Sequence, residues 1–100
     1  MSLHTSRRGG TVIVRAEGRI DSRNAGEFEA CLPAADDARS NILIDLQDVD
    51  YMSSAGLRVL VIVTKASRVR GGRVVLAAPK PAILKTLKTS GFDQFLEIHA

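Results

Sequence analysis

The sequence contains few of the residues that most often carry catalysis or metal binding. Its 100 residues include one cysteine, two histidines and no tryptophan. The single cysteine, Cys31, excludes an intramolecular disulfide, and we expect it to be a core residue in a reducing compartment. His4 and His99 lie near the two ends, without a cysteine or glutamate at metal-ligand spacing. We therefore expect no metal site and no catalytic residue, since no nucleophile–base pair can be read.

Long apolar runs and dense basic patches are also missing. No window reaches the roughly 18 apolar residues that span a bilayer, and the first residues lack the apolar region of a signal peptide. We therefore expect a cytoplasmic protein without membrane insertion. The net charge is only +3 and there are four aromatic residues, which argues against direct nucleic-acid binding. The glycine pairs at 9–10 and 71–72 lack the context of a phosphate-binding loop, so we expect turns there and no cofactor.

Apolar segments rich in branched residues alternate with segments of helical spacing. Strands are predicted at residues 11–16, 42–46 and 73–78, with an edge strand at 3–8 or a mobile N-terminus at 1–9, and a short strand at 96–98. A first helix is predicted to begin at an N-cap, Asp21 or Ser22, because Ala25, Phe28, Cys31 and Leu32 follow at helical spacing. Pro33 and residues 34–40 are expected to end or kink it. A last helix is predicted from Pro81 to Gly91. This order predicts one α/β domain over residues 1–100, with a mixed four- to five-stranded sheet and helices packed against it.

Residues 57–63 are apolar and ambiguous, because their β-branched side chains also suit a strand. Serines precede them, and Lys65 and Arg68 stand near the far end, ahead of two glycines. Cations and glycine suit the end of a helix, so we predict a helix here. It would be apolar around most of its circumference, which allows a partner or a second copy of the chain to cover one side.

Ser53 and Ser54 lie where this helix begins, after an acidic segment that we interpret as a loop, residues 45–50. The simpler interpretation is that one hydroxyl caps the helix and that Gly56 allows close packing. The functional interpretation is that one hydroxyl accepts a phosphoryl group. A helix N-terminus tolerates the added anion, because its free N–H groups and the helix dipole face it.

At these residues the sequence resembles the STAS domain family, and within it the bacterial anti-sigma factor antagonists. The resemblance covers residues 10–98, and its parts are Gly18-Arg19-Ile20-Asp21 with Ala25 and Phe28, then Asp45-Leu46, Val49, Tyr51-Met52 and Ser54-Ala55-Gly56-Leu57, then Leu76, Pro81, Leu84, Leu87, Gly91 and Phe95. In that family the serine two positions before the glycine is the phosphoacceptor, which implies Ser54. The usual aspartate before it is Ser53 here, and this leaves Ser53 as a second candidate.

The resemblance implies a partner switch. The unphosphorylated protein would bind an anti-sigma factor with serine kinase activity and free a sigma factor for transcription. Phosphorylation at Ser54 would release that partner, and a protein phosphatase would restore the hydroxyl. The implied contact residues are Asp21, Ser22, Arg23, Ser53, Ser54, Gly56, Leu57 and Arg58, together with the exposed side of the helix up to Arg68.

Two other functions compete with this switch. The first is a STAS domain that serves, without phosphorylation, as a structural subunit of a lipid-transport ATPase complex or a signalling scaffold. The second is a small nucleotide-hydrolysing enzyme. The sequence disfavours an enzyme, because it has neither a phosphate-binding loop nor a readable general base.

Overall fold

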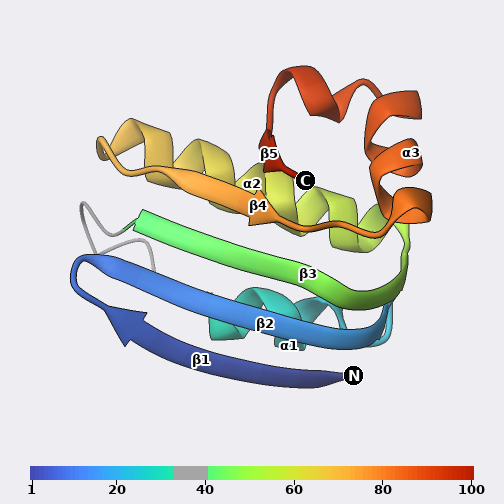
Figure 1. Cartoon of the computed structure of the whole chain (residues 1–100), viewed down its shortest axis with the longest axis horizontal. Coiled ribbons are helices and arrows are strands. Elements are labelled where there is room, and N and C mark those ends of the chain that lie inside the picture. Colours follow the sequence, from blue (N-terminus) through green and yellow to red (C-terminus); the bar gives the residue numbers. More distant parts are fainter. Residues whose placement is uncertain (33–40) are drawn as a thin grey trace.

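In a computed structural model that describes residues 1–32 and 41–100, the chain forms one five-stranded sheet with helices packed against it (Figure 1). The predicted end of the first helix, at Pro33 and residues 34–40, lies outside the described residues. The elements in chain order are β1 Ser2–Arg8, β2 Thr11–Ile20, α1 Ala25–Cys31, β3 Asn41–Met52, α2 Ser54–Val69, β4 Val74–Ala77, α3 Pro81–Thr89, the 3-10 helix η1 Phe92–Gln94 and β5 Glu97–His99.

The strands lie in the sheet in the order of the sequence, β1-β2-β3-β4-β5. The edge strand β1 pairs antiparallel with β2 through a tight turn, in which Gly9 takes the left-handed backbone conformation at φ 56°. All later pairs are parallel, which requires a helical crossover between each strand and the next. The predicted mixed sheet with packed helices is confirmed. Figure 1 shows α1 and α2 against the same side of the sheet.

Strand β3 is longer than the sequence pattern predicts. We expected a strand at residues 42–46 and an acidic loop at 45–50, but β3 continues to Met52. Its pairing with β2 shifts register twice, between Arg15 and Glu17 and between Gly18 and Arg19. The buried side chains of β3 alternate every second residue from Ile42 to Leu46. After the irregularities the next ones are Val49 and Met52, three residues apart. The prediction of a loop was therefore wrong.

Residues 57–63 are helical, as predicted, within α2. Leu57, Leu60 and Thr64 are buried at helical spacing, and they face the sheet and α1. The helix ends where Gly71 donates its backbone N–H to the carbonyl of Arg68 at 3.1 Å. Ile62, in the same helix, is 44% exposed. Part of the apolar surface of α2 is therefore accessible to solvent.

The C-terminal part closes the far edge of the sheet. Pro81 is the first residue of α3, and Gly91 (φ 81°) follows its end, both as predicted. The guanidinium of Arg68 lies 4.5 Å from the ring centre of Phe95 and donates to its carbonyl at 2.6 Å. These two contacts join η1 and the following turn to the end of α2.

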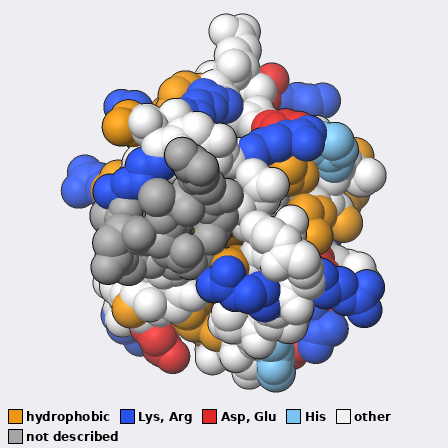
Figure 2. Space-filling view, turned by 90° about the vertical axis from the view of Figure 1, so that its left-hand side faces the viewer, with side chains coloured by type: hydrophobic (Ala, Val, Ile, Leu, Met, Phe, Trp, Pro, Cys, Tyr) orange, Lys and Arg blue, Asp and Glu red, His pale blue; other side chains and the backbone are white. Residues whose placement is uncertain are grey.

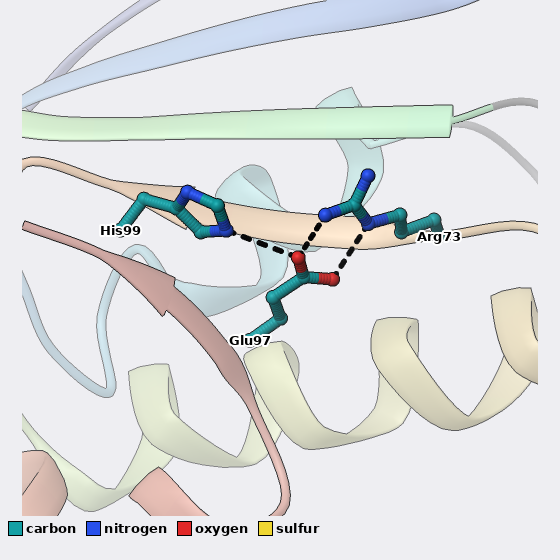
Figure 3. A network of polar contacts seen from close by, with 3 residues as sticks. All are labelled: Arg73, Glu97 and His99. Atoms are coloured by element: carbon teal, nitrogen blue, oxygen red, sulfur yellow. Dashed lines mark hydrogen bonds and ion pairs between the residues drawn. The ribbon is translucent and has the colours of Figure 1, made fainter.

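An exposed polar network connects β4 to β5. Glu97 accepts from Arg73 at 2.7 Å and forms a second, charge-assisted contact with the same guanidinium (Figure 3). The ring nitrogen Nε2 of His99 lies 3.0 Å from Glu97 Oε2. Hydrogen bonds from Arg73 and His99 lower the pKa of Glu97 from 4.5 to about 2.

Candidate functional site

The two serines lie where β3 passes into α2. The backbone N–H of Ser53 donates to the carbonyl of Ile20 at 2.9 Å, which fixes the junction to the end of β2. Ser53 is the N-cap residue, with extended φ/ψ of −81° and 175°, and its carbonyl accepts the first helical bond from Leu57 at 3.0 Å. The predicted position of the helix start is therefore confirmed.

The two hydroxyls differ in accessibility. Ser54 is exposed, whereas Ser53 is half-buried and its Oγ atom is buried, without a hydrogen-bond partner among the described residues. The side chain of Ser53 makes no capping bond to the helix, so the expected cap hydrogen bond is not formed. Of these two serines, Ser54 is therefore the more accessible. Local chemistry alone does not separate two adjacent serines, so the sequence favoured Ser54 only through its place in the family motif, two positions before Gly56.

Gly56 lets the first turn of α2 rest on the strand ends. A Cβ atom at this position would lie 2.8 Å from Met52 Cγ and 2.9 Å from Ile20 Cγ2, closer than packed carbon atoms allow. Leu57, the next residue, is 7% exposed and belongs to the core. Gly56 and Leu57 were both predicted to contact a partner. They are instead buried in the packing of the helix against the strands, and they do not lie on the surface of the site.

The predicted contact residues Asp21, Ser22 and Arg23 form the turn that follows β2. Asp21 Oδ1 accepts from the backbone of Arg23 at 3.0 Å, and Asn24 Oδ1 accepts from the backbone of Asp21 at 2.9 Å. Ser22 and Arg23 are exposed. Because Ile20 binds Ser53, this turn begins beside the serine junction.

The predicted N-cap at Asp21 or Ser22 was wrong. The helix α1 begins at Ala25, and Asn24 stands at its N-cap. Asn24 also donates from Nδ2 to the carbonyl of Arg19 at 2.9 Å, so its side chain holds the turn and does not cap the helix. Side chains of the Asp and Asn type form such local turns in competition with helix.

A surface hollow of about 320 Å³ lies between α1 and α2 and includes the exposed serine. Its lining comes from both helices: Ala25, Gly26 and Glu29 of α1, and Ser54, Ala55, Arg58, Val59 and Ile62 of α2. Ser54 and Arg58, which are both predicted contact residues, therefore line the same hollow. Sequence analysis missed Gly26 and Glu29, whereas Ile62 belongs to the exposed side of the helix that it included. The small residues at 25–26, on the first turn of the first helix, are the signal that could have indicated close approach of two helices.

Charged groups near the junction are mostly paired. Lys80 and Asp50 form an ion pair at 2.5 Å, Arg23 lies 3.6 Å from Asp21, and the Arg19 guanidinium lies 4.3 Å from the ring centre of Tyr51. Arg58 has no hydrogen-bond or ion-pair partner within residues 1–32 and 41–100. Within the described part of the chain, the lining of the hollow therefore includes a cation, Arg58, that is not engaged in an ion pair.

The described residues also bear on four other kinds of site: a basic patch, a metal-ligand cluster, a membrane span and a reactive cysteine. On the left-hand side of the molecule, seen face-on in Figure 2, the described lysine and arginine side chains are scattered and form no continuous patch. No three histidine, cysteine or acidic side chains of the described residues stand close enough to hold a metal ion. Among the same residues, no helix is both long enough and apolar enough to cross a membrane. Cys31 is half-buried beside the core, and this burial raises the pKa of its thiol.

Comparison with known proteins gives consistent results. A model of the STAS domain family matches residues 2–100. BtrV of Bordetella bronchiseptica, named as a candidate anti-sigma factor antagonist, is 38% identical over 93 residues, which cover 92% of this chain and 80% of BtrV. A crystal structure of a candidate anti-sigma factor antagonist from Thermotoga maritima has a TM-score of 0.86 at 22% identity, covering 98% of this chain and 86% of that one.

The anti-sigma factor antagonist SpoIIAA of Bacillus has been solved in two forms. The unphosphorylated form matches with a TM-score of 0.81 at 18% identity, and the match covers 99% of this chain and 89% of SpoIIAA. The phosphorylated form matches with a TM-score of 0.77 at 20% identity, covering 99% and 92%. These likenesses confirm the fold.

Proposed function

The chain belongs to the STAS domain family, and from this premise we propose that it is an anti-sigma factor antagonist that works by partner switching. In its unphosphorylated form it binds an anti-sigma factor that is also a serine kinase, and this binding frees a sigma factor for transcription. Phosphorylation of Ser54 releases the partner, and a protein phosphatase restores the hydroxyl. The protein acts as a kinase substrate and binding module.

One observation carries the choice of Ser54 over Ser53. Ser54 is exposed as the first residue of α2, whereas the Oγ atom of Ser53 is buried under the junction. A kinase must reach the acceptor oxygen from outside, so burial disfavours Ser53. The first turn of a 16-residue helix also suits the product, because unpaired N–H groups and the helix dipole stabilise a negative charge there.

In the phosphoryl transfer this chain supplies the nucleophile, the hydroxyl of Ser54. Ser54 Oγ attacks the γ-phosphorus of ATP, a new Oγ–P bond forms, and the bond to the bridging oxygen breaks to release ADP. The hydroxyl proton passes to a base, which we assign to the kinase. The chain's own histidines lie in β1 and β5, where His4 and His99 pair with Glu17 and Glu97.

The docking surface consists of the turn after β2 and the first turns of α2. Its exposed members are Ser22, Arg23, Ser54 and Arg58. The hollow between α1 and α2 gives it a concave centre, and Ile62 contributes an exposed apolar side chain to the lining of that hollow. Apolar contact with a polar rim is the usual composition of a protein interface.

Phosphorylation changes binding through charge, without a change of fold. A phosphate carries about −1.5 to −2 charges at neutral pH. An unpaired dianion in a desolvated interface costs several kcal/mol, and each ~1.4 kcal/mol is tenfold in affinity. We therefore expect phosphorylation to weaken binding by about 100-fold or more.

The test uses purified protein, candidate anti-sigma factor kinases and ATP. Mass spectrometry should locate one phosphate on Ser54, absent from Ser54→Ala and retained in the matched control Ser53→Ala. Calorimetry should show tight binding of the unmodified protein and weakened binding of Ser54→Asp. Modification of Ser53 alone would show that the acceptor was assigned wrongly. Equal binding of the phosphorylated and unphosphorylated forms would refute the switch.

The same experiment separates the switch from a structural role. A subunit of a transport or scaffold complex would copurify with that complex and would remain unmodified by every kinase tested. If the protein both copurified with such a complex and remained unmodified, a structural role would replace the proposed switch.

A further inference from the structure

Arg58 stands one helical turn after Ser54, and both residues line the hollow between α1 and α2. We propose that Arg58 is the intramolecular counter-ion of the phosphate at Ser54, and that phosphorylation therefore withdraws Arg58 from the docking surface. This inference rests on the proposed function and adds to it a residue that holds the modified state.

Helix geometry brings the two side chains together. Residues four apart in a helix are neighbours on its surface, with Cβ atoms about 5–6 Å apart. Side chains in a helix generally lean toward its N-terminus, and from position 58 this is the direction of the turn that begins with Ser54. A planar guanidinium can donate two parallel hydrogen bonds to a phosphate, which an ammonium group cannot do.

The neighbouring cations are engaged elsewhere. Arg19 lies over the ring of Tyr51, and the described structure pairs Arg23 with Asp21 and Lys80 with Asp50. Arg58 has no such partner in residues 1–32 and 41–100. A dianion at Ser54 would therefore gain a contact with Arg58 without breaking an ion pair that Arg58 forms with any described residue.

The charged groups that line the hollow act in opposite directions. Arg58 comes from α2 and attracts the phosphate, whereas Glu29 comes from α1 and repels it. Asp21 and Arg23, in the turn before α1, largely cancel each other as a pair. Because the phosphate and Arg58 lie on one helix, their contact needs no movement of α1. Replacing Arg58 and replacing Glu29 should thus have effects of opposite sign.

The experiment uses protein in which phosphoserine is incorporated at position 54 during translation, so no kinase or partner is needed. Phosphorus NMR then follows the second ionisation of the phosphate, whose ordinary pKa is about 6. Arg58→Ala should raise this pKa by about 0.15–0.4 unit, or roughly twofold in proton affinity, as for a surface pair on one helix. Glu29→Gln should lower it. Arg58→Lys should restore part of the shift.

Lys65→Ala is the matched control, since it removes one exposed cation from the same helix two turns further on, outside the hollow. It should leave the phosphate titration unchanged. An equal shift in Arg58→Ala and Lys65→Ala, or no shift in either, overturns the proposal. Arg58 is exposed, and a thermal melt of each variant verifies that it is folded.

Failure here and failure of the switch are distinguishable. The titration is measured on the isolated chain, so it reports the contact between phosphate and Arg58 whether or not a partner binds. Loss of this coupling with an intact switch would leave the proposed function standing without its counter-ion. A titration shift without any binding of a partner would support the counter-ion and refute the switch.

Discussion

The contact of Gly56 with the two strand ends makes a quantitative prediction about stability. In Gly56→Ala the new methyl group would stand 2.8 Å from Met52 Cγ and 2.9 Å from Ile20 Cγ2. Both side chains are buried, at 4% and 0% exposure, so neither can turn into solvent to make room. Overpacking of this kind costs about 1–3 kcal/mol.

Helix propensity opposes this cost. Alanine is better than glycine in a helix by up to about 1 kcal/mol. The net expectation is a destabilisation of about 1 kcal/mol, and of at most about 2 kcal/mol. Since 1 kcal/mol shifts the melting temperature of a domain this small by about 4–8 °C, the variant should melt several degrees lower.

Gly26→Ala is the matched control. Gly26 is also in the first turn of a helix, but a Cβ atom there meets nothing within 4 Å. Without a clash only the propensity gain remains, and we expect stabilisation by about 0.5–1 kcal/mol. Urea unfolding and thermal melts measure both variants. Stabilisation by Gly56→Ala, or equal losses in the two variants, would refute the packing argument. Met52→Ala should suppress part of the loss in a double-mutant cycle, because it removes the contacted Cγ atom.

Three further predictions concern single polar groups. Ser53→Ala should not destabilise the protein, because the hydroxyl makes no capping bond and is buried without a partner among the described residues; a loss of about 1 kcal/mol in urea unfolding would show that such a bond exists. Thr64→Val should stabilise the protein by about 1 kcal/mol, since the Thr64 hydroxyl is buried without a partner among the described residues, and an unchanged or lower melting temperature would contradict this. Glu97→Gln tests the network with Arg73: with a pKa of about 2 when folded against 4.5 normally, Glu97 stabilises the fold above pH 4.5 and loses this effect as pH falls toward 2. The difference in melting temperature between wild type and variant should therefore be largest near pH 6 and vanish near pH 2, and a difference independent of pH would exclude this ion pair as its cause.

Features fixed by local sequence were predictable. Pro81 begins a helix and Gly91 follows its end because these residues restrict or permit particular backbone angles. The helix over residues 57–63 was also predictable despite its β-branched residues, since the serines before it and the cations and glycines after it suit helix ends. The family motif around Gly56 could likewise be located at the junction of β3 and α2, because its residues are close together in the sequence.

Features that depend on contacts between distant residues were not predictable. The length of β3 depends on irregular pairing with β2, and the start of α1 depends on the side chain of Asn24, which holds the preceding turn. Leu57 was expected on the partner surface, yet it faces the core, because only the packing of α2 on the sheet decides which helical positions are covered.

The sequence by itself determined the order of strands and helices, the family, and the pair of serines at the start of α2. These follow from periodicity, from backbone preferences and from a motif of neighbouring residues. Only the tertiary structure decided which of the two hydroxyls is accessible and which cation shares its hollow. Ser53 is held by Ile20, which lies at the end of a different strand, and the hollow at Ser54 and Arg58 exists only because α1 packs beside α2. Adjacent serines have the same local chemistry, and the difference in their burial is added by the tertiary structure to a family motif that already indicated Ser54.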